Sequence, residues 1–194
     1  MKKDIKSMSI SELKNDISEM NEKSFKAGQI YSWLHKQTVD SFEEMTNISK
    51  ELRAKLEKNY DIYTCSIEKK LVSVYDDTVK YLFRLYDGEY IESVVMKYKY
   101  GYTICVSSQV GCKMGCNFCA SGIAGFVRNL SAGEILSQVY TAQRDLDIRI
   151  SHIVMMGVGE PLDNFDNVMK FLSMVSDDKG VNIGMRNISL STCG

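Results

Sequence analysis

The sequence predicts a mixed α/β fold built from three consecutive parts. Apolar residues recur at helical spacing up to about residue 60, whereas residues 65–96 alternate as strands do. From about residue 98 onward, strand-like and helix-like segments follow each other in turn, which is typical of a parallel sheet with helical crossovers. We therefore expect a helical accessory domain at 1–60, an antiparallel β meander at 61–97 and an α/β unit at 98–194.

The helical part shows its pattern in two segments. Ile30, Trp33 and Leu34 share one helix face, and Leu52 and Leu56 share another. Ser49 precedes the second segment and suits an N-cap, because its hydroxyl can accept a hydrogen bond from a free N–H group of the first turn.

Three strand-like runs, at 71–75, 81–86 and 90–96, make up the meander. Asp76-Asp77 and Asp87-Gly88 separate them, and an Asp-Gly pair between apolar runs is a strong hairpin signal. We expect two tight turns there.

The α/β unit reads as strand, helix, strand, helix, strand. Ser131 and Glu134 form the spacing of a capping box that opens the first helix. A buried strand is expected at 153–156, a helix at 165–176 and a strand at 187–192. The expected inward-facing residues are Ile135, Leu136, Val139 and Tyr140 in the first helix and Val168, Leu172 and Val175 in the second. Because the unit stops on an apolar strand with an open edge, we expect the chain to be a fragment.

Composition sets limits on function. The chain has 194 residues, 44% hydrophobic content and a net charge of −1, and no segment is apolar enough to span a membrane. Because nucleic acids are held largely by Lys and Arg, an RNA-binding role would need a local basic patch. Tyr98, Tyr100 and Tyr102 alternate with Lys97 and Lys99, which is compatible with RNA contact beside the site or with ordinary strand alternation.

The most informative motif is the spacing Cys112-x3-Cys116-x2-Cys119, with Phe118 before the last cysteine. An iron–sulfur cluster normally takes four thiolates, so three close cysteines would leave one iron open to another ligand. A structural zinc site would need a fourth Cys or His nearby, and His35 and His152 are the only histidines and lie near no partner cysteine. Structural disulfides are disfavoured because the chain opens without a signal-peptide core, which indicates a reducing compartment.

The cysteine spacing resembles the cluster motif of the radical S-adenosylmethionine superfamily. Five segments are similar to the adenine carbon-2 methyltransferases that act on 23S ribosomal RNA and transfer RNA: TICVSSQVGC at 103–112, CASG at 119–122, FVRNLSAGEI at 126–135, MMGVGEPLDN at 155–164 and ISLSTCG at 188–194. Val158 stands where that family commonly has methionine, a change between apolar residues. The resemblance implies a partial parallel (β/α) barrel, of which this chain would form the first half.

The resemblance also implies a cofactor site. Cys112, Cys116 and Cys119 would bind a 4Fe-4S cluster, and S-adenosylmethionine would bind the open iron. Gly159 and Glu160 would contact the methionine part of that cofactor, with glycine allowing close backbone approach. Ser191 would offer it a hydroxyl, although such a hydroxyl equally often satisfies local backbone.

Two further residues match catalytic positions of that family. Glu92 would accept a proton, although from the sequence alone it could be a solvent-facing strand residue. Cys105 would resolve a protein–RNA adduct and leave a disulfide, although a lone cysteine in an apolar strand is usually a small buried hydrophobe. The family's reaction passes through a methyl group carried on a second cysteine near the C-terminus, which this chain lacks; Cys193 is interpreted as structural.

The resemblance further implies 23S rRNA and tRNA as partners, an electron donor such as flavodoxin, a monomer, no membrane association and a cytoplasmic location. Two alternatives stay open at this point. A related enzyme methylates carbon 8 of the same adenine with the same cluster chemistry, and a structural-metal RNA-binding module would hold zinc through the three cysteines.

Overall fold

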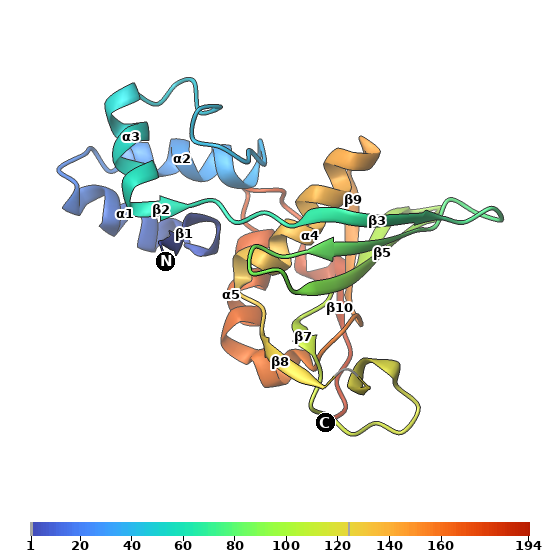
Figure 1. Cartoon of the computed structure of the whole chain (residues 1–194). Coiled ribbons are helices and arrows are strands. Elements are labelled where there is room, and N and C mark those ends of the chain that lie inside the picture. Colours follow the sequence, from blue (N-terminus) through green and yellow to red (C-terminus); the bar gives the residue numbers. More distant parts are fainter. Residues whose placement is uncertain (1, 124) are drawn as a thin grey trace.

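A mixed sheet forms the centre of the molecule in the computed structural model, which describes residues 2–123 and 125–194. Three helices from the first 60 residues form a layer at one end of this sheet (Figure 1). The helices are α1 (Ile10–Glu19), α2 (Phe25–His35), α3 (Lys50–Asn59), α4 (Ala132–Leu146) and α5 (Phe165–Val175). The strands are β1 (Lys3–Asp4), β2 (Tyr60–Asp61), β3 (Ser66–Val72), β4 (Val79–Arg84), β5 (Tyr90–Tyr98), β6 (Gly101–Cys105), β7 (Gln109–Gly111), β8 (Phe126–Asn129), β9 (Ile150–Met155) and β10 (Ile188–Leu190). Short 3-10 turns lie at η1 (Ile5–Ser7), η2 (Ala120–Gly122), η3 (Pro161–Asn164) and η4 (Met185–Asn187).

The central sheet joins the meander to the α/β unit. Its strand order is β10-β9-β6-β5-β4-β3. Strands β6, β9 and β10 are parallel, with α4 and α5 as their crossovers, whereas β3 to β6 pair antiparallel. The predicted α/β class with parallel strands is confirmed, and so is the predicted order of strands and helices.

Local signals in the sequence formed the expected turns and caps. Gly88 has a φ of 91°, and the Asp87 side chain accepts a hydrogen bond from the Glu89 N–H group, which closes the β4–β5 turn. The Ser49 hydroxyl accepts a hydrogen bond from the Leu52 N–H group at the start of α3. Both hydrogen bonds of the predicted capping box at Ser131 are present.

Helices α4 and α5 cover one face of the sheet. The Ser93 hydroxyl donates to the Gln138 side chain of α4 at 2.7 Å, so Ser93 faces this helix layer. Ile104 and Ile153 are fully buried on the same side. The predicted stripe of α4 is fully buried, and in α5 Val168 and Val175 are buried while Leu172 is half-buried.

The opposite face of the sheet is called the open face here and is defined by Glu92, Val94, Cys105 and Val154. Val94 pairs with Cys105, and Cys105 pairs with Val154, so these three side chains share a face. Glu92 lies two residues before Val94 on β5 and therefore shares it too. In the described part of the chain, no helix covers this face (Figure 1).

Polar contacts attach α1–α3, called the N-terminal layer here, to the crossover helices. The Lys6 side chain is fully buried, and its Nζ donates to Asp40 at 3.1 Å and to Thr64 at 2.9 Å. Arg144 of α4 also pairs with Asp40.

Two contacts extend this attachment. The His35 Nδ1 atom of α2 lies 2.9 Å from the Tyr140 hydroxyl of α4. Lys170 of α5 pairs with Glu12 of α1 at 2.6 Å. The layer is therefore fixed to the sheet unit through both crossover helices.

The structure adds a two-stranded ribbon that the sequence did not reveal. Strands β7 and β8 pair antiparallel, with Val110 opposite Arg128. They enclose residues 112–125, called the cysteine loop here, where only an irregular loop was expected. No described helix is long and apolar enough to cross a membrane.

Candidate active site

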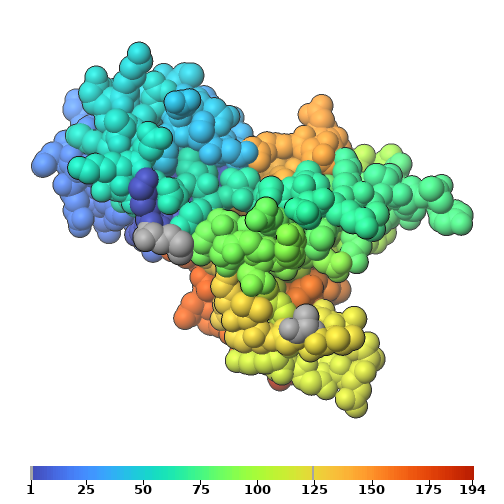
Figure 2. Space-filling view, viewed as in Figure 1, coloured from blue at the N-terminus to red at the C-terminus, as the bar shows by residue number. Residues whose placement is uncertain are grey.

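Three motif segments meet at one end of the parallel strands. The cysteine loop follows β6 through the short strand β7, residues 156–160 follow β9, and residues 191–194 follow β10. In Figures 1 and 2 the cysteine loop projects from the lower end of the molecule, and the end of the chain lies beside it in Figure 1. In open parallel sheets, ligands bind at this end of the strands.

The cysteine loop offers free thiols from a short segment. All six cysteines of the chain are free, and Cys112 and Cys116 are half-buried while Cys119 is exposed. The Cys119 N–H group donates to the Cys116 carbonyl at 3.0 Å, which places these two residues in one turn. The hydroxyl and backbone N–H group of Ser121 lower the pKa of the Cys119 thiol, which favours the thiolate that binds metal.

These donors fit an iron–sulfur cluster in kind. Three thiols on one loop are the ligand type that such clusters take, and no other ligand type is needed. Among residues 2–123 and 125–194, however, no three metal-ligating side chains are already gathered around one point. The loop therefore carries the donors but does not hold them in a closed ligand sphere.

The turn after β9 is held by the segment that leads into the cysteine loop. The Val158 N–H group donates to the Ser107 hydroxyl at 3.0 Å. The Val158 carbonyl accepts from the N–H groups of Ser108 and Gln109, at 2.9 and 3.2 Å. Both sides of this peptide are therefore fixed by three consecutive residues.

The glycines of this turn are explained by the same contact. A Cβ atom on Gly157 would lie 2.6 Å from the Val106 carbonyl oxygen and 2.8 Å from the Ser107 nitrogen. Gly159 has a φ of +105°, and a Cβ atom there would lie 2.6 Å from the Gln109 Cβ. The close approach that glycine permits is thus made first of all to the protein's own backbone.

Glu160 lies buried at the end of this turn. Its carboxylate accepts hydrogen bonds from the Leu162 N–H group at 3.0 Å and from the Cys193 N–H group at 2.9 Å. Partial burial opposes ionisation, yet the N–H groups of Cys193 and Leu162 outweigh it and lower the pKa of the carboxyl. Glu160 is therefore ionised at neutral pH and joins the ends of β9 and β10.

Ser191 and Cys193 lie in the segment that follows β10. Both are exposed, and Ser191 is attached through its N–H group, which lies 3.4 Å from the Met155 carbonyl oxygen. A hydrogen bond to Glu160 raises the pKa of the Cys193 thiol, which also lies close enough to Cys116 to feel its charge. This segment therefore lies between Glu160 and the cysteine loop.

Glu92 and Cys105 share the open face. Glu92 is about half exposed and pairs with Lys80 at 2.8 Å. Burial raises the pKa of the Cys105 thiol, although the Met156 N–H group opposes this shift. Because Val94 pairs with Cys105, Glu92 and Cys105 are diagonal neighbours on adjacent strands.

Gln109 is a site residue that the sequence did not single out. It is fully buried, and its Oε1 accepts from the Glu160 N–H group at 2.9 Å. Its Nε2 donates to Asn129 of β8 and to Asp163, both at 2.7 Å. Asp163 also pairs with Lys113 of the cysteine loop at 2.8 Å. A glutamine inside an apolar motif next to a cysteine loop was the available signal.

Asn164 makes a similar connection. Its Nδ2 donates to the carbonyls of Ser108 at 2.8 Å and Leu130 at 2.7 Å, and its side chain is almost fully buried. The second half of the segment 155–164 therefore anchors the turn to both ends of the β7–β8 ribbon.

The tyrosine and lysine cluster lies elsewhere than expected. Tyr98 and Tyr100 stack with ring centroids 5.1 Å apart at the turn before β6. The cysteine loop follows the other end of β6, so the cluster occupies the opposite end of the sheet and the expectation that it lies beside the site is wrong. The sequence gave adjacency along the chain, but the intervening strand separates the two features.

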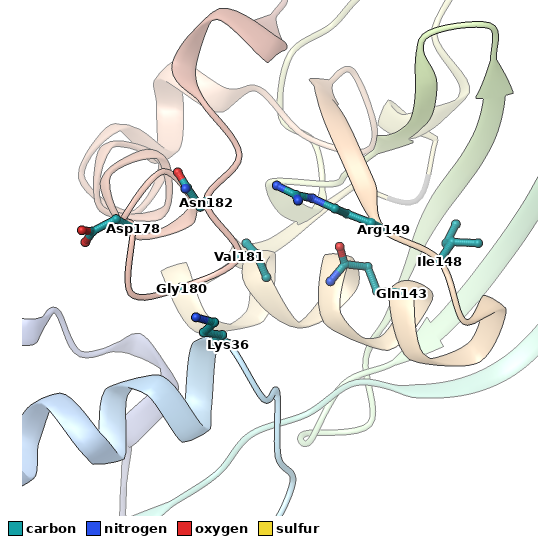
Figure 3. Close-up of a pocket in the computed structure, with 8 residues that line it drawn as sticks. All are labelled: Lys36, Gln143, Ile148, Arg149, Asp178, Gly180, Val181 and Asn182. Atoms are coloured by element: carbon teal, nitrogen blue, oxygen red, sulfur yellow. The ribbon is translucent and has the colours of Figure 1, made fainter.

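A separate cleft also lies at that opposite end. Its volume is about 390 Å³, and it opens between the end of α2, the end of α4 and the segment before β9 (Figure 3). None of the predicted site residues lines it; its lining residues are Lys36, Gln143, Ile148, Arg149, Asp178, Gly180, Val181 and Asn182.

Comparisons with known proteins agree with the motifs. Residues 3–62 match the family model described as "Ribosomal RNA large subunit methyltransferase N-terminal domain". A protein of Lachnoclostridium phytofermentans named "Probable dual-specificity RNA methyltransferase RlmN" is 53% identical over 98% of this chain and 54% of its own length. A protein of the same name from Clostridium perfringens is 55% identical over 99% of this chain and 55% of its own length.

A solved structure is similar as well. It is described as the "Crystal Structure of a radical SAM methyltransferase from Sphaerobacter thermophilus". The TM-score is 0.91 at 35% identity, and the match covers 99% of this chain and 57% of that one. The chain thus spans about half the length of the relatives it matches. Over that half, the resemblance that the five sequence segments predicted is confirmed, and the chain is similar throughout to dual-specificity RNA methyltransferases of the RlmN type.

Proposed function

We propose that this chain forms the cofactor-binding half of a radical S-adenosylmethionine methyltransferase that modifies carbon 2 of adenine in 23S rRNA and tRNA. The observation that carries the proposal is the meeting of the cysteine loop, the 157–160 turn and the 191–193 segment at one end of the parallel strands. The names of the relatives and of the similar solved structure support the same activity.

In this proposal the fold is the first half of a partial (β/α) barrel. The helix layer of α4 and α5 would lie outside, and the open face would line the interior. Glu92, Cys105 and the end of β10 would then surround the space in which a base is held. Placing a base there requires it to leave its stack, as enzymes that act on bases achieve by flipping.

The residues have the following proposed roles. Cys112, Cys116 and Cys119 would hold a 4Fe-4S cluster, which when bound would supply the electron that starts radical chemistry on S-adenosylmethionine. The buried carboxylate Glu160 and the backbone of Gly159 would lie along the methionine part of that cofactor, and Ser191 would offer its hydroxyl from the end of β10.

Two residues of the open face would act on the RNA. Glu92 is accessible and would accept a proton from the adenine, because its carboxylate lies free of helix contacts on this face. Cys105 would exchange with a second thiol supplied from outside this chain, and the six free thiols are compatible with a reducing compartment such as the cytoplasm. A flavodoxin-type electron donor and a monomeric state remain predictions.

The test is anaerobic reconstitution of the chain with iron and sulfide, followed by iron, sulfide and zinc analysis and EPR spectroscopy of the reduced sample. We expect near four irons per chain and a spectrum that changes when S-adenosylmethionine is added. Replacing Cys116 with Ala should abolish iron uptake, whereas replacing the buried Cys65 should not. Stoichiometric zinc, or an iron spectrum indifferent to the cofactor, would overturn the proposal.

A further inference from the structure

The side chain of Gln109 joins the two segments that the proposed function assigns to different cofactors. It lies on β7, directly before the cysteine loop, and is fully buried. Its amide oxygen accepts from the Glu160 N–H group at 2.9 Å, at the end of the turn proposed for S-adenosylmethionine. Its amide nitrogen donates to Asp163 and to Asn129.

Every hydrogen-bonding group of this amide is therefore used. A buried amide that is fully satisfied fixes its partners, because breaking any one bond leaves a buried polar group unpaired. Asp163 extends the connection, since its second oxygen accepts from Lys113, the neighbour of Cys112, at 2.8 Å. Gln109 and Asp163 together thus bind the entry and the exit of the cysteine loop to the 157–163 segment.

Packing allows few alternatives at this point. The backbone of Gly159 lies directly against Gln109, so close that a Cβ atom on Gly159 would lie 2.6 Å from the Gln109 Cβ and 2.8 Å from its Cγ. The glutamine side chain is consequently held from both its apolar stem and its amide.

We propose that Gln109 is a positioning residue that sets the distance and orientation of the S-adenosylmethionine turn relative to the cysteine loop. This inference rests on the proposed function for the identity of the two ligands. The latch itself, meaning the contacts of Gln109 with Glu160, Asp163 and Asn129, does not depend on it.

The main variant is Gln109→Met, which keeps the length of the side chain and removes its hydrogen bonds. Gln143→Met is the matched control, because the Gln143 Oε1 accepts from the Ile150 N–H group at 3.0 Å, at the opposite end of the same strand β9. Both variants should unfold cooperatively with similar losses of stability, since each loses one amide side chain that satisfies a backbone N–H group.

Hydrogen exchange on the chain without cofactors is the first measurement. In Gln109→Met the Glu160 amide should exchange about tenfold faster or more, with the Ile150 amide unchanged, and in Gln143→Met the pattern should reverse. Unchanged exchange at Glu160 would overturn the latch.

The second measurement separates positioning from mere stability. After anaerobic reconstitution, Gln109→Met should retain the iron content of the wild type, but the S-adenosylmethionine concentration that changes its EPR spectrum should rise about tenfold or more. An unchanged titration in this variant, beside a responsive wild type, would overturn the proposal. A wild type that never responds would overturn the proposed function, and hydrogen exchange would still decide whether the latch exists.

Reversal of donor and acceptor provides a rescue. Gln109→Glu alone should be worse than Gln109→Met, because it places a carboxylate beside the Asp163 carboxylate. Combining Gln109→Glu with Asp163→Asn restores a donor opposite an acceptor and should recover the protection of the Glu160 amide. Failure of the double variant to improve on Gln109→Glu would count against the latch.

Discussion

At the scale of single residues, burial divides the six cysteines into reactive and inert groups. Cys65 is almost fully buried beneath α4 and its Sγ contacts the Thr141 hydroxyl at 3.4 Å. Burial raises the pKa of the Cys65 thiol to about 11. Cys119 is exposed, and its pKa is lowered. The thiol chemistry of the chain therefore lies on the loop and not in the core.

This contrast predicts the order of alkylation. In the folded chain without metal at pH 8, iodoacetamide should modify Cys119 within minutes and leave Cys65 unmodified, because only the thiolate reacts and about one Cys65 in a thousand would carry it. Peptide mass spectrometry over time gives the rates. Modification of both residues at the same rate in a sample that retains its circular dichroism would contradict the placement of Cys65.

His35 gives a second prediction at this scale. It is fully buried, and burial lowers its pKa to about 3, with the charge of Lys6 acting in the same direction. The unfolded chain binds a proton near pH 6.5, but the folded chain does not. Stability should therefore be full above pH 6.5 and fall as the pH drops below it, by at most about 1.4 kcal/mol for each pH unit.

Urea denaturation between pH 7 and pH 5 measures this slope, in a window above the titration of most carboxyl groups. His35→Gln should flatten it, since the variant keeps a polar partner for the Tyr140 hydroxyl without a titrating ring. A slope that is the same in both proteins would show that His35 does not carry it.

At the scale of elements, the contact between the 106–109 segment and the 157–159 turn determines which glycines are replaceable. Gly157→Ala would place a methyl group 2.6 Å from the Val106 carbonyl oxygen, against backbone that cannot rotate away. We expect a loss of about 1–3 kcal/mol, as for other overpacked sites. Gly115→Ala in the cysteine loop meets no atom within 4 Å and should change stability by less than about 1 kcal/mol. Urea midpoints compare the two, and equal losses would show that the close contact does not constrain position 157.

The elements also show what the sequence could predict. Asp87-Gly88, Ser49 and the Ser131 capping box are local signals, and each formed the structure expected of it. The β7–β8 ribbon was not predictable in this way, because strands of three and four residues carry too little alternation to be detected.

For the site, sequence motifs identified the segments but not their connections. The position of the tyrosine cluster was wrong because neighbours in sequence can lie at opposite ends of a strand. Gln109 was missed because the importance of a buried amide depends on partners about 20 and 50 residues away, which only the fold brings together.

At the scale of the whole molecule, the N-terminal layer and the sheet unit are joined by buried polar contacts. Lys6 is fully buried between them, and Glu12 pairs with Lys170 across the same boundary. The amine of Lys6 would be left without its partners if the two parts separated. We therefore expect the chain to unfold as one unit.

Trp33, the only tryptophan, lies in α2 and reports on the N-terminal layer. Its fluorescence and the far-ultraviolet circular dichroism of the whole chain should give the same urea midpoint. Lys6→Met should lower that midpoint for both probes, because it leaves the Asp40 and Thr64 oxygens without their buried donor. Two separate midpoints in the wild type would mean that the layer unfolds independently.

The β7–β8 ribbon has a thermodynamic consequence for metal uptake. It brings the two ends of the cysteine loop together, and the Cys112 N–H group donates to the Gly125 carbonyl at 3.0 Å. Part of the entropy lost in closing a chelate ring around a metal is thus already lost in the protein alone. Iron binding and ribbon pairing are coupled equilibria, so each should strengthen the other by the same factor. Any condition that opens the ribbon should release iron, and iron loading should protect the ribbon amides from exchange.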